Sequence, residues 1–377
     1  MFLPMGSRDE IGTIVENRFY VIEQFRKIAS ERAYEEISTP VIEYAKTFTN
    51  EYVNMKLQHM MKWFNSEGEI EVLRPDWTIA IARAIANQAN GDTYPQKWAY
   101  AGPVFNQNHP GVISHQAGIE LIHEQELLGD SECLLMAQKV LDNIHAGSYV
   151  IELGHAGIYE QIATQLQLSE QDQEQLRIAM HDKKKDEVYE IAKSSGNEQI
   201  ATELATLVDA FGNMDVITEF EQRWSEYPEL LAMLQHLKEV ILLVGQSENV
   251  EILVDLGRVK NLPYYTGVMF RGFLKESGAV CFSGGRYDQL YDQFDQHVSA
   301  VGLAFEVDIL AEEIETNGRK TKICLLVDDD TLAFAEEARK QFSEQIVDVQ
   351  YGESAIGSFD EIYEVIKDDT TYKVVRK

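Results

Sequence analysis

The stretches Leu262-Pro-Tyr-Tyr-Thr-Gly267 and Cys281-Phe-Ser-Gly-Gly-Arg-Tyr-Asp288 decide how this chain is interpreted. Taken alone, they are typical of a β-hairpin, with aromatic residues on a strand and Gly284-Gly285 in a tight turn. A ligand site is the alternative interpretation, and the other segments of the chain decide between the two.

Other distinctive segments lie before and after these two in the sequence. They are Pro4-Met-Gly-Ser-Arg-Asp9, residues 34–43 with Pro40, Leu73-Arg-Pro-Asp-Trp-Thr78, residues 98–105 leading to His115-Gln-Ala-Gly-Ile-Glu120, and Ser299-Ala-Val-Gly-Leu-Ala304. The whole set resembles the ordered motifs of histidyl-tRNA synthetases, a class II family, over most of residues 1–310. This resemblance implies an α+β fold with a class II synthetase-like antiparallel sheet flanked by helices.

The hydrophobic pattern predicts where the parts of the fold lie. Phe19, Ile22, Phe25 and Ile28 recur at helical spacing in a first helix. Strand-like runs occupy residues 98–105, 118–122, 149–153, 250–256, 268–273, 279–283 and 300–305. Their close neighbours can pair locally, which indicates a largely antiparallel sheet.

Residues 164–247 contain mostly good helix formers, and we expect them to form a helical insertion. The core domain is then discontinuous, with residues 1–163 and 248–316. Residues 317–377 are expected to form a small α/β domain. In this domain the pattern predicts strands at 323–327 and 346–351, a helix at 332–342 and a short element at 359–366.

The resemblance implies a histidine-binding pocket. A histidine ligand needs a carboxylate for its ammonium group, a polar partner for each ring nitrogen, and aromatic walls. The positions matching this pocket are Asp76, Thr78, Gln116, Glu120, Lys260, Tyr264, Tyr265 and Tyr287. Ordinary structural roles stay open for single residues: Asp76 as a helix N-cap and Glu120 as an exposed strand residue.

The residues that bind ATP in the synthetases are replaced here. Activation brings a carboxylate to a phosphate, so fixed cations must stabilise the developing charge. At the matching positions this chain has Asn106, Asn108, Glu306 and Ile309, and Lys260 stands in place of an arginine. The loop over ATP is shortened to Pro110-Gly-Val-Ile-Ser114. We therefore predict that the chain activates no amino acid, and we assign it no catalytic residue and no cofactor.

Charge and composition restrict the partners. The 377 residues carry a net charge of −30, which disfavours phosphate-backbone binding and is compatible with docking onto a more basic protein. Because of this charge, we expect no nucleic-acid binding. We expect no membrane binding either, because no apolar run approaches bilayer length. Three widely spaced cysteines and no signal peptide indicate a reduced, cytoplasmic protein. His109, His115 and His123 have no cysteine or acidic ligand at metal spacing, so no metal site is expected.

A synthetase-like fold with an amino-acid pocket but no ATP clamp resembles the regulatory subunits of ATP phosphoribosyltransferase. The resemblance implies assembly with the short-form catalytic subunit into a hetero-oligomer, commonly a hetero-octamer. It also implies a self-dimer through the synthetase-like core and histidine as a feedback effector of the first step of histidine biosynthesis. The alternatives are a histidyl-tRNA synthetase and an orphan synthetase-like amino-acid sensor.

Overall fold

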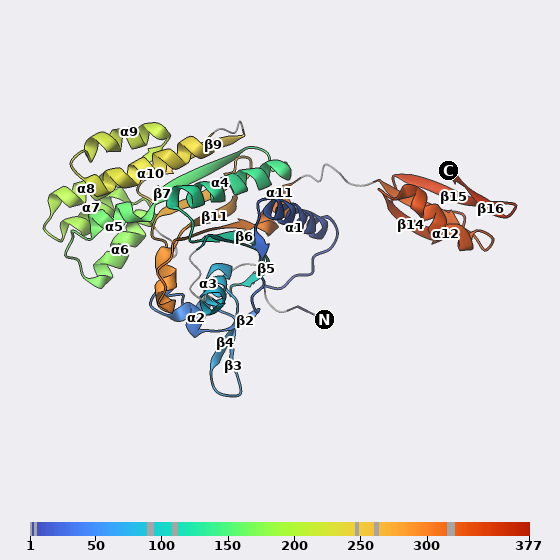
Figure 1. Cartoon of the computed structure of the whole chain (residues 1–377), viewed down its shortest axis with the longest axis horizontal. Helices are drawn as coiled ribbons and strands as arrows, with labels where there is room; N and C mark the ends of the chain where they lie inside the picture. The colour runs from blue at the N-terminus through green and yellow to red at the C-terminus, as the bar shows by residue number, and fades with distance from the viewer. Residues whose placement is uncertain are drawn as a thin grey trace. The chain divides into compact units, whose positions relative to one another are not determined.

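The computed structural model describes residues 2–3, 6–88, 94–107, 112–245, 249–259, 264–314 and 321–377. The chain divides into two compact units, Met1–Ile314 and Glu315–Lys377 (Figure 1). Within the described residues, no helix is both long and apolar enough to cross a membrane.

The first unit is built on a large mixed sheet with strand order β1-β5-β6-β12-β11-β10-β7-β9-β8. In that order the strands are β1 (Glu35–Glu36), β5 (Gln96–Phe105), β6 (Ile113–Ile122), β12 (Ala300–Glu306), β11 (Val280–Arg286), β10 (Val268–Leu274), β7 (Tyr149–His155), β9 (Val250–Asp255) and β8 (Phe211–Gly212). The β1–β5 and β7–β9 pairs are parallel, and the other neighbours are antiparallel. The predicted antiparallel-dominated α+β fold is confirmed.

Three helices cover one face of this sheet: α1 (Thr13–Glu31), α4 (Glu126–Asn143) and α11 (Val307–Glu313). Their apolar side chains and those of the strands form one large core, to which α1 contributes Val21, Phe25 and Ile28. The predicted apolar face of α1 is partly wrong, because Phe19 is 67% exposed. A spacing of three residues drifts around a helix of 3.6 residues per turn, so Phe19 and Ile28 cannot share one face.

The opposite face has a second core. It includes α3 (Trp77–Gln88), the 3₁₀ helix η2 (Asp288–Phe294) and a small sheet of order β2-β4-β3. The bounds of that sheet and of the short helices beside it are β2 (Ile42–Tyr44), β3 (Lys62–Phe64), β4 (Ile70–Leu73), α2 (Lys46–Thr49) and η1 (Leu57–His59).

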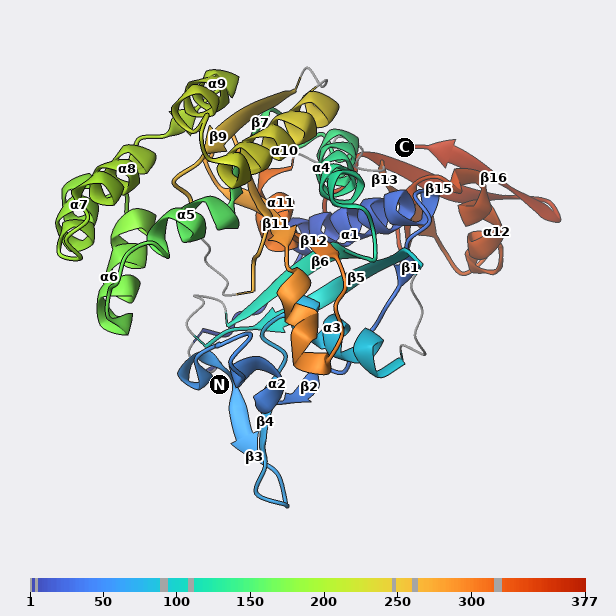
Figure 2. The ribbon, with the colours of Figure 1, turned by 60° about the vertical axis from the view of Figure 1, so that its left-hand side comes forward.

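A group of helices lies beside the β7–β9 edge of the sheet (Figure 2). They are α5 (Ala156–Ala163), α6 (Glu170–His181), α7 (Lys185–Lys193), α8 (Glu198–Val208), α9 (Met214–Arg223) and α10 (Pro228–Val244). Side chains of Ser169, Asn197 and Asn213 cap three of these helices, as local sequence predicts. Their buried residues belong to the same core as the sheet. The domain boundaries at residues 164 and 247 stay a prediction.

The second unit has its own four-stranded sheet of order β14-β13-β15-β16. The strands are β13 (Lys322–Val327), β14 (Ile346–Tyr351), β15 (Glu361–Asp368) and β16 (Thr371–Arg376). The stretch predicted as one helix at 332–342 is helical over that range but is not one regular α-helix: it forms η3 (Leu332–Phe334), the short α12 (Ala335–Arg339) and η4 (Lys340–Phe342). The core is small and includes Leu325, Val327, Ala338 and Val365.

Candidate functional site

A cavity lies on the α3 side of the large sheet, over β6, β12 and β11; it has about 450 Å³ of empty space, part of which is open to solvent. Successive side chains of a strand point to opposite faces, so Gln116, Gly118 and Glu120 of β6 face the same side. Gly302, at the middle of β12, pairs with Glu120. A Cβ atom at Gly302 would lie only 1.9 Å from a carboxylate oxygen of Glu120. Glycine therefore leaves the space that the glutamate side chain occupies.

Glu120 is held by two hydroxyl groups at the bottom of the cavity. The hydroxyl of Thr78 donates to Oε1 over 2.7 Å, and the hydroxyl of Tyr287 donates to Oε2. Glu120 is only 1% exposed, so its interpretation as an exposed strand residue is wrong. Burial raises the pKa of Glu120 to about 8, although the Tyr287 and Thr78 hydrogen bonds oppose that shift.

Asp76 has a structural role at the N-terminus of α3 and also lines the cavity. Its Oδ1 accepts a hydrogen bond from the backbone N–H of Ile79 over 2.9 Å, which is the geometry of an N-cap. Its Oδ2 accepts from the hydroxyl of Tyr264 over 3.4 Å. Burial raises the pKa of the Asp76 carboxyl, and the hydrogen bonds from Ile79 and Tyr264 work against it.

Aromatic rings form the walls. Tyr264 makes edge contacts with Tyr265 and Tyr287, at centroid distances of 5.3 and 6.1 Å. The tight-turn interpretation of Gly284-Gly285 is wrong, because both residues lie inside β11 and pair with β10 and β12. A Cβ atom at Gly285 would come within 3.0 Å of the Tyr265 ring. The segment with Tyr264 and Tyr265 and the segment from Ser283 to Tyr287 therefore line the same cavity.

Two acidic residues, Glu306 and Asp308, lie next to Gln116 and His115 of β6. The Nε2 amide of Gln116 donates to Glu306 over 3.1 Å. Burial raises the pKa of Glu306; Gln116 lowers it, and Asp308 raises it further. Asp308 itself accepts from Arg18 over 2.6 Å and from the backbone N–H of His115 over 2.8 Å.

Most of the predicted site residues lie together at this cavity. Asp76, Thr78, Gln116, Tyr264, Tyr265 and Tyr287 line the cavity. Glu120 lies behind Thr78 and Tyr287, to which it is bonded. Lys260 and Asn108 lie outside the described residues. Within the described part of the chain, no group of three metal-ligating side chains is found.

Sequence reasoning missed Tyr100, which lines the cavity from β5 and stacks on Trp77 with centroids 4.9 Å apart. Tyr100 pairs with Gly118, two residues from Glu120 along β6, and this pairing is known only from the strand register. Ser283, Leu303 and Ala304 also line the cavity and were not predicted.

Comparison with known proteins agrees with this geometry. The family model of histidyl-tRNA synthetase matches residues 10–310. The chain is 34% identical over 324 residues to an ATP phosphoribosyltransferase regulatory subunit of Bacillus cereus (strain B4264), covering 83% of this chain and 76% of the relative. Identity, aligned length and coverage are the same for the protein of that name from Bacillus mycoides (strain KBAB4).

A crystal structure from Bacillus halodurans, described as an ATP phosphoribosyltransferase regulatory subunit/histidyl-tRNA synthetase, superposes with a TM-score of 0.80. It shares 25% sequence identity with this chain, and the match covers 94% of both chains. The chain therefore belongs to the family of ATP phosphoribosyltransferase regulatory subunits, which is built on the histidyl-tRNA synthetase fold.

Proposed function

We propose that this chain binds free histidine in the cavity beside α3 and regulates the catalytic subunit of an ATP phosphoribosyltransferase. The observation that carries the proposal is a cavity lined by Asp76, Thr78 and Tyr287, with buried Glu120 bonded to the last two. Asp76 supplies a carboxylate for the ligand ammonium group. Thr78 and Tyr287 supply polar groups for the imidazole, Glu120 holds their hydroxyls from behind, and Tyr264 and Tyr265 supply the walls.

We propose further that the chain does not activate histidine with ATP. In a synthetase, cations would have to stabilise the charge on the transferring phosphate. Here Asn106 and Ile309 stand at positions expected to hold arginine. The nearby Arg18 is bound by Glu10 and Asp308, and Glu306 adds a further carboxylate. A triphosphate would meet repulsion, so the chain has no catalytic residue in this proposal.

The partner in this proposal is a separate short-form catalytic subunit, which condenses ATP with phosphoribosyl pyrophosphate in the first step of histidine biosynthesis. The complex would be a hetero-oligomer, with a hetero-octamer as the expected stoichiometry and a self-dimer of this chain through its synthetase-like core. Histidine would inhibit the complex through its differential affinity for a less active arrangement, because a ligand shifts an equilibrium only by that difference.

The test is co-expression with the short-form catalytic subunit, followed by co-purification and phosphoribosyltransferase assays with and without histidine. We expect a stable complex, activity that depends on this chain, and inhibition by histidine. Histidine-dependent exchange of pyrophosphate into ATP by this chain alone would instead identify a synthetase. Histidine binding without complex formation would indicate an unrelated amino-acid sensor.

Substitution of Asp76 separates its two roles. Asp76→Asn keeps a good N-cap but removes the charge that pairs with the ammonium group, so we expect histidine affinity to fall by about tenfold or more with stability nearly unchanged. Asp76→Ala removes both roles and should cost a further ~1 kcal/mol of unfolding free energy. Calorimetry with histidine and urea unfolding measure the two effects. Wild-type affinity in Asp76→Asn would remove Asp76 from the ligand site.

A further inference from the structure

We propose that Arg286, Asp130 and His236 form a buried polar chain that couples the cavity to helix α10, so that histidine binding stabilises α10. This inference rests on the proposed function, because it assumes that histidine occupies the cavity. Asp130 and His236 act as positioning residues in it: neither lines the cavity, and both act through Arg286.

Arg286 connects the cavity to the helix-covered face of the sheet. It directly precedes Tyr287, whose hydroxyl holds Glu120, but its own side chain points the other way and donates to Asp130 Oδ1 over 2.7 Å. The Arg286 side chain is 4% exposed and that of Asp130 is 0% exposed. The guanidinium also donates to the backbone carbonyl of Glu126 in α4 over 3.2 Å.

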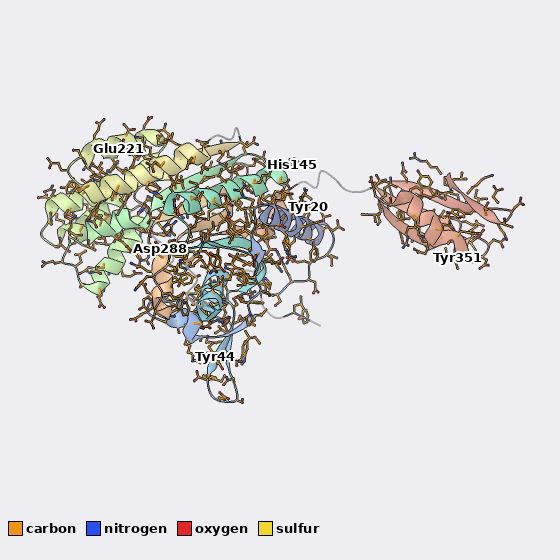
Figure 3. The ribbon with its side chains drawn as sticks, viewed as in Figure 1. Tyr20, Tyr44, His145, Glu221, Asp288 and Tyr351 are labelled. Carbon is orange, nitrogen blue, oxygen red and sulfur yellow. The ribbon has the colours of Figure 1, made fainter. Side chains whose placement is uncertain are left out.

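The backbone of Arg286 is tied to the cavity wall. Its carbonyl accepts from the N–H of Thr266 over 2.8 Å, and Thr266 follows Tyr265. A Cβ atom at Gly267 would lie 2.9 Å from Cδ of Arg286, so this segment packs directly on the arginine stem. The same guanidinium donates to Asp288 over 3.2 Å, and Asp288 accepts from the N–H of Ala300 on β12. Asp288 is labelled in Figure 3. Movement of the wall around Tyr265 must therefore move Arg286.

His236 continues the chain into the helices beside the sheet. Its Nε2 lies 2.7 Å from Asp130 Oδ2. One oxygen of this fully buried carboxylate is therefore bonded to Arg286 of β11, and the other is bonded to His236 of α10. His236 belongs to α10, whose Lys238 donates to Glu221 of α9 over 2.9 Å. Glu221 is also labelled in Figure 3. Elements far apart in sequence are thus joined through Asp130.

Stability alone does not explain this arrangement. A buried ion pair often adds no more stability than apolar residues of the same volume, because desolvation offsets the attraction. Directional hydrogen bonds do set relative positions, and a carboxylate with both oxygens engaged cannot follow one partner without pulling on the other. A ligand that immobilises Tyr265 and Tyr287 should therefore reduce the local opening of α10.

The experiment combines calorimetry with hydrogen–deuterium exchange on the full chain, with and without L-histidine. In the wild type we expect histidine to slow exchange both around the cavity and in α10. His236→Phe should abolish the histidine-dependent protection of α10, keep the protection around the cavity, and weaken histidine binding by roughly two- to thirtyfold. A merely structural role for His236 would change basal exchange but leave the histidine-dependent difference in place.

Gln138→Met is the matched control. Gln138 of α4 donates to the carbonyl of Val244 in α10 over 2.8 Å, so this variant loses a bond between the same two helices without touching Asp130. We expect it to keep wild-type histidine affinity and histidine-dependent protection of α10. A double-mutant cycle of His236→Phe with Tyr287→Phe should show non-additive effects on histidine affinity.

The outcomes are distinguishable. Histidine binding with no change in α10 exchange in the wild type overturns the coupling but leaves the proposed function standing. Unchanged affinity and unchanged α10 protection in His236→Phe also overturn it. A folded wild-type chain that binds no histidine overturns both proposals.

Discussion

Glu120 shows what happens to a carboxyl group that is buried with hydroxyl groups as its partners. Its side chain has almost no contact with water, and among the described residues the carboxylate is bonded by the hydroxyls of Thr78 and Tyr287. Hydroxyls stabilise a carboxylate less than a cation does, so burial dominates and the pKa rises to about 8.

This shift predicts a pH dependence of stability. An unfolded glutamate has a pKa of about 4.3, so between that value and about 8 the folded chain binds more protons at Glu120 than the unfolded chain does. The stabilising contribution is complete below pH ~4 and is lost as pH rises towards 8. Its upper limit is about 5 kcal/mol, at about 1.4 kcal/mol for each pKa unit.

Urea unfolding at pH 5, 6, 7 and 8 without ligand measures this contribution as a difference between variants. We expect the unfolding free energy of the wild type to decline over this range, and Glu120→Gln to flatten that decline. Glu276→Gln, at an exposed carboxylate, should leave the decline unchanged. Parallel pH profiles for the wild type and Glu120→Gln would show that Glu120 is ionised in the folded chain across this range.

At the scale of elements, close approach between strands shapes the cavity. β12 runs between β6 and β11, and its Gly302 faces Glu120 on one neighbour and Gly285 on the other. Strand glycines usually weaken a sheet, but here the missing side chain makes room for the glutamate. The sequence shows the glycine, and only the strand register shows which group fills the space beside it.

Gly302→Ala tests this packing. The added methyl group would overlap Glu120, so the glutamate or the strand must move, and we expect a loss of about 1–3 kcal/mol in unfolding free energy. Histidine affinity should fall as well, because Thr78 and Tyr287 lose their shared partner. Urea unfolding and calorimetry measure the two effects. A variant with wild-type stability and affinity would mean that Glu120 can leave this position freely.

At the scale of the whole molecule, the chain has two units with separate cores. The described cavity residues lie between Asp76 and Ala304, inside the first unit. The second unit is built around β13 and has its own apolar cluster. Histidine binding and the function of residues 315–377 should therefore be separable.

Truncation after Ile314 tests this separation. A chain of residues 1–314 should bind histidine within about a factor of two of full-length affinity, because compact units with their own cores are largely independent. Calorimetry checks the affinity, and co-purification with the catalytic subunit shows whether residues 315–377 are needed for assembly. A large loss of histidine affinity in a well-folded truncated chain would contradict the division.

The sequence by itself determined the family, the antiparallel sheet and six of the thirteen described residues that line the cavity, because ordered motifs and alternating apolar runs are local signals. Burial of Glu120, the place of Gly284 inside β11 and the bonds of Asp130 to both Arg286 and His236 were decided only by the tertiary structure. Each of these features depends on which strands and helices become neighbours. Asp130 is more than a hundred positions from both Arg286 and His236, and no local sequence pattern predicts contacts at such a separation.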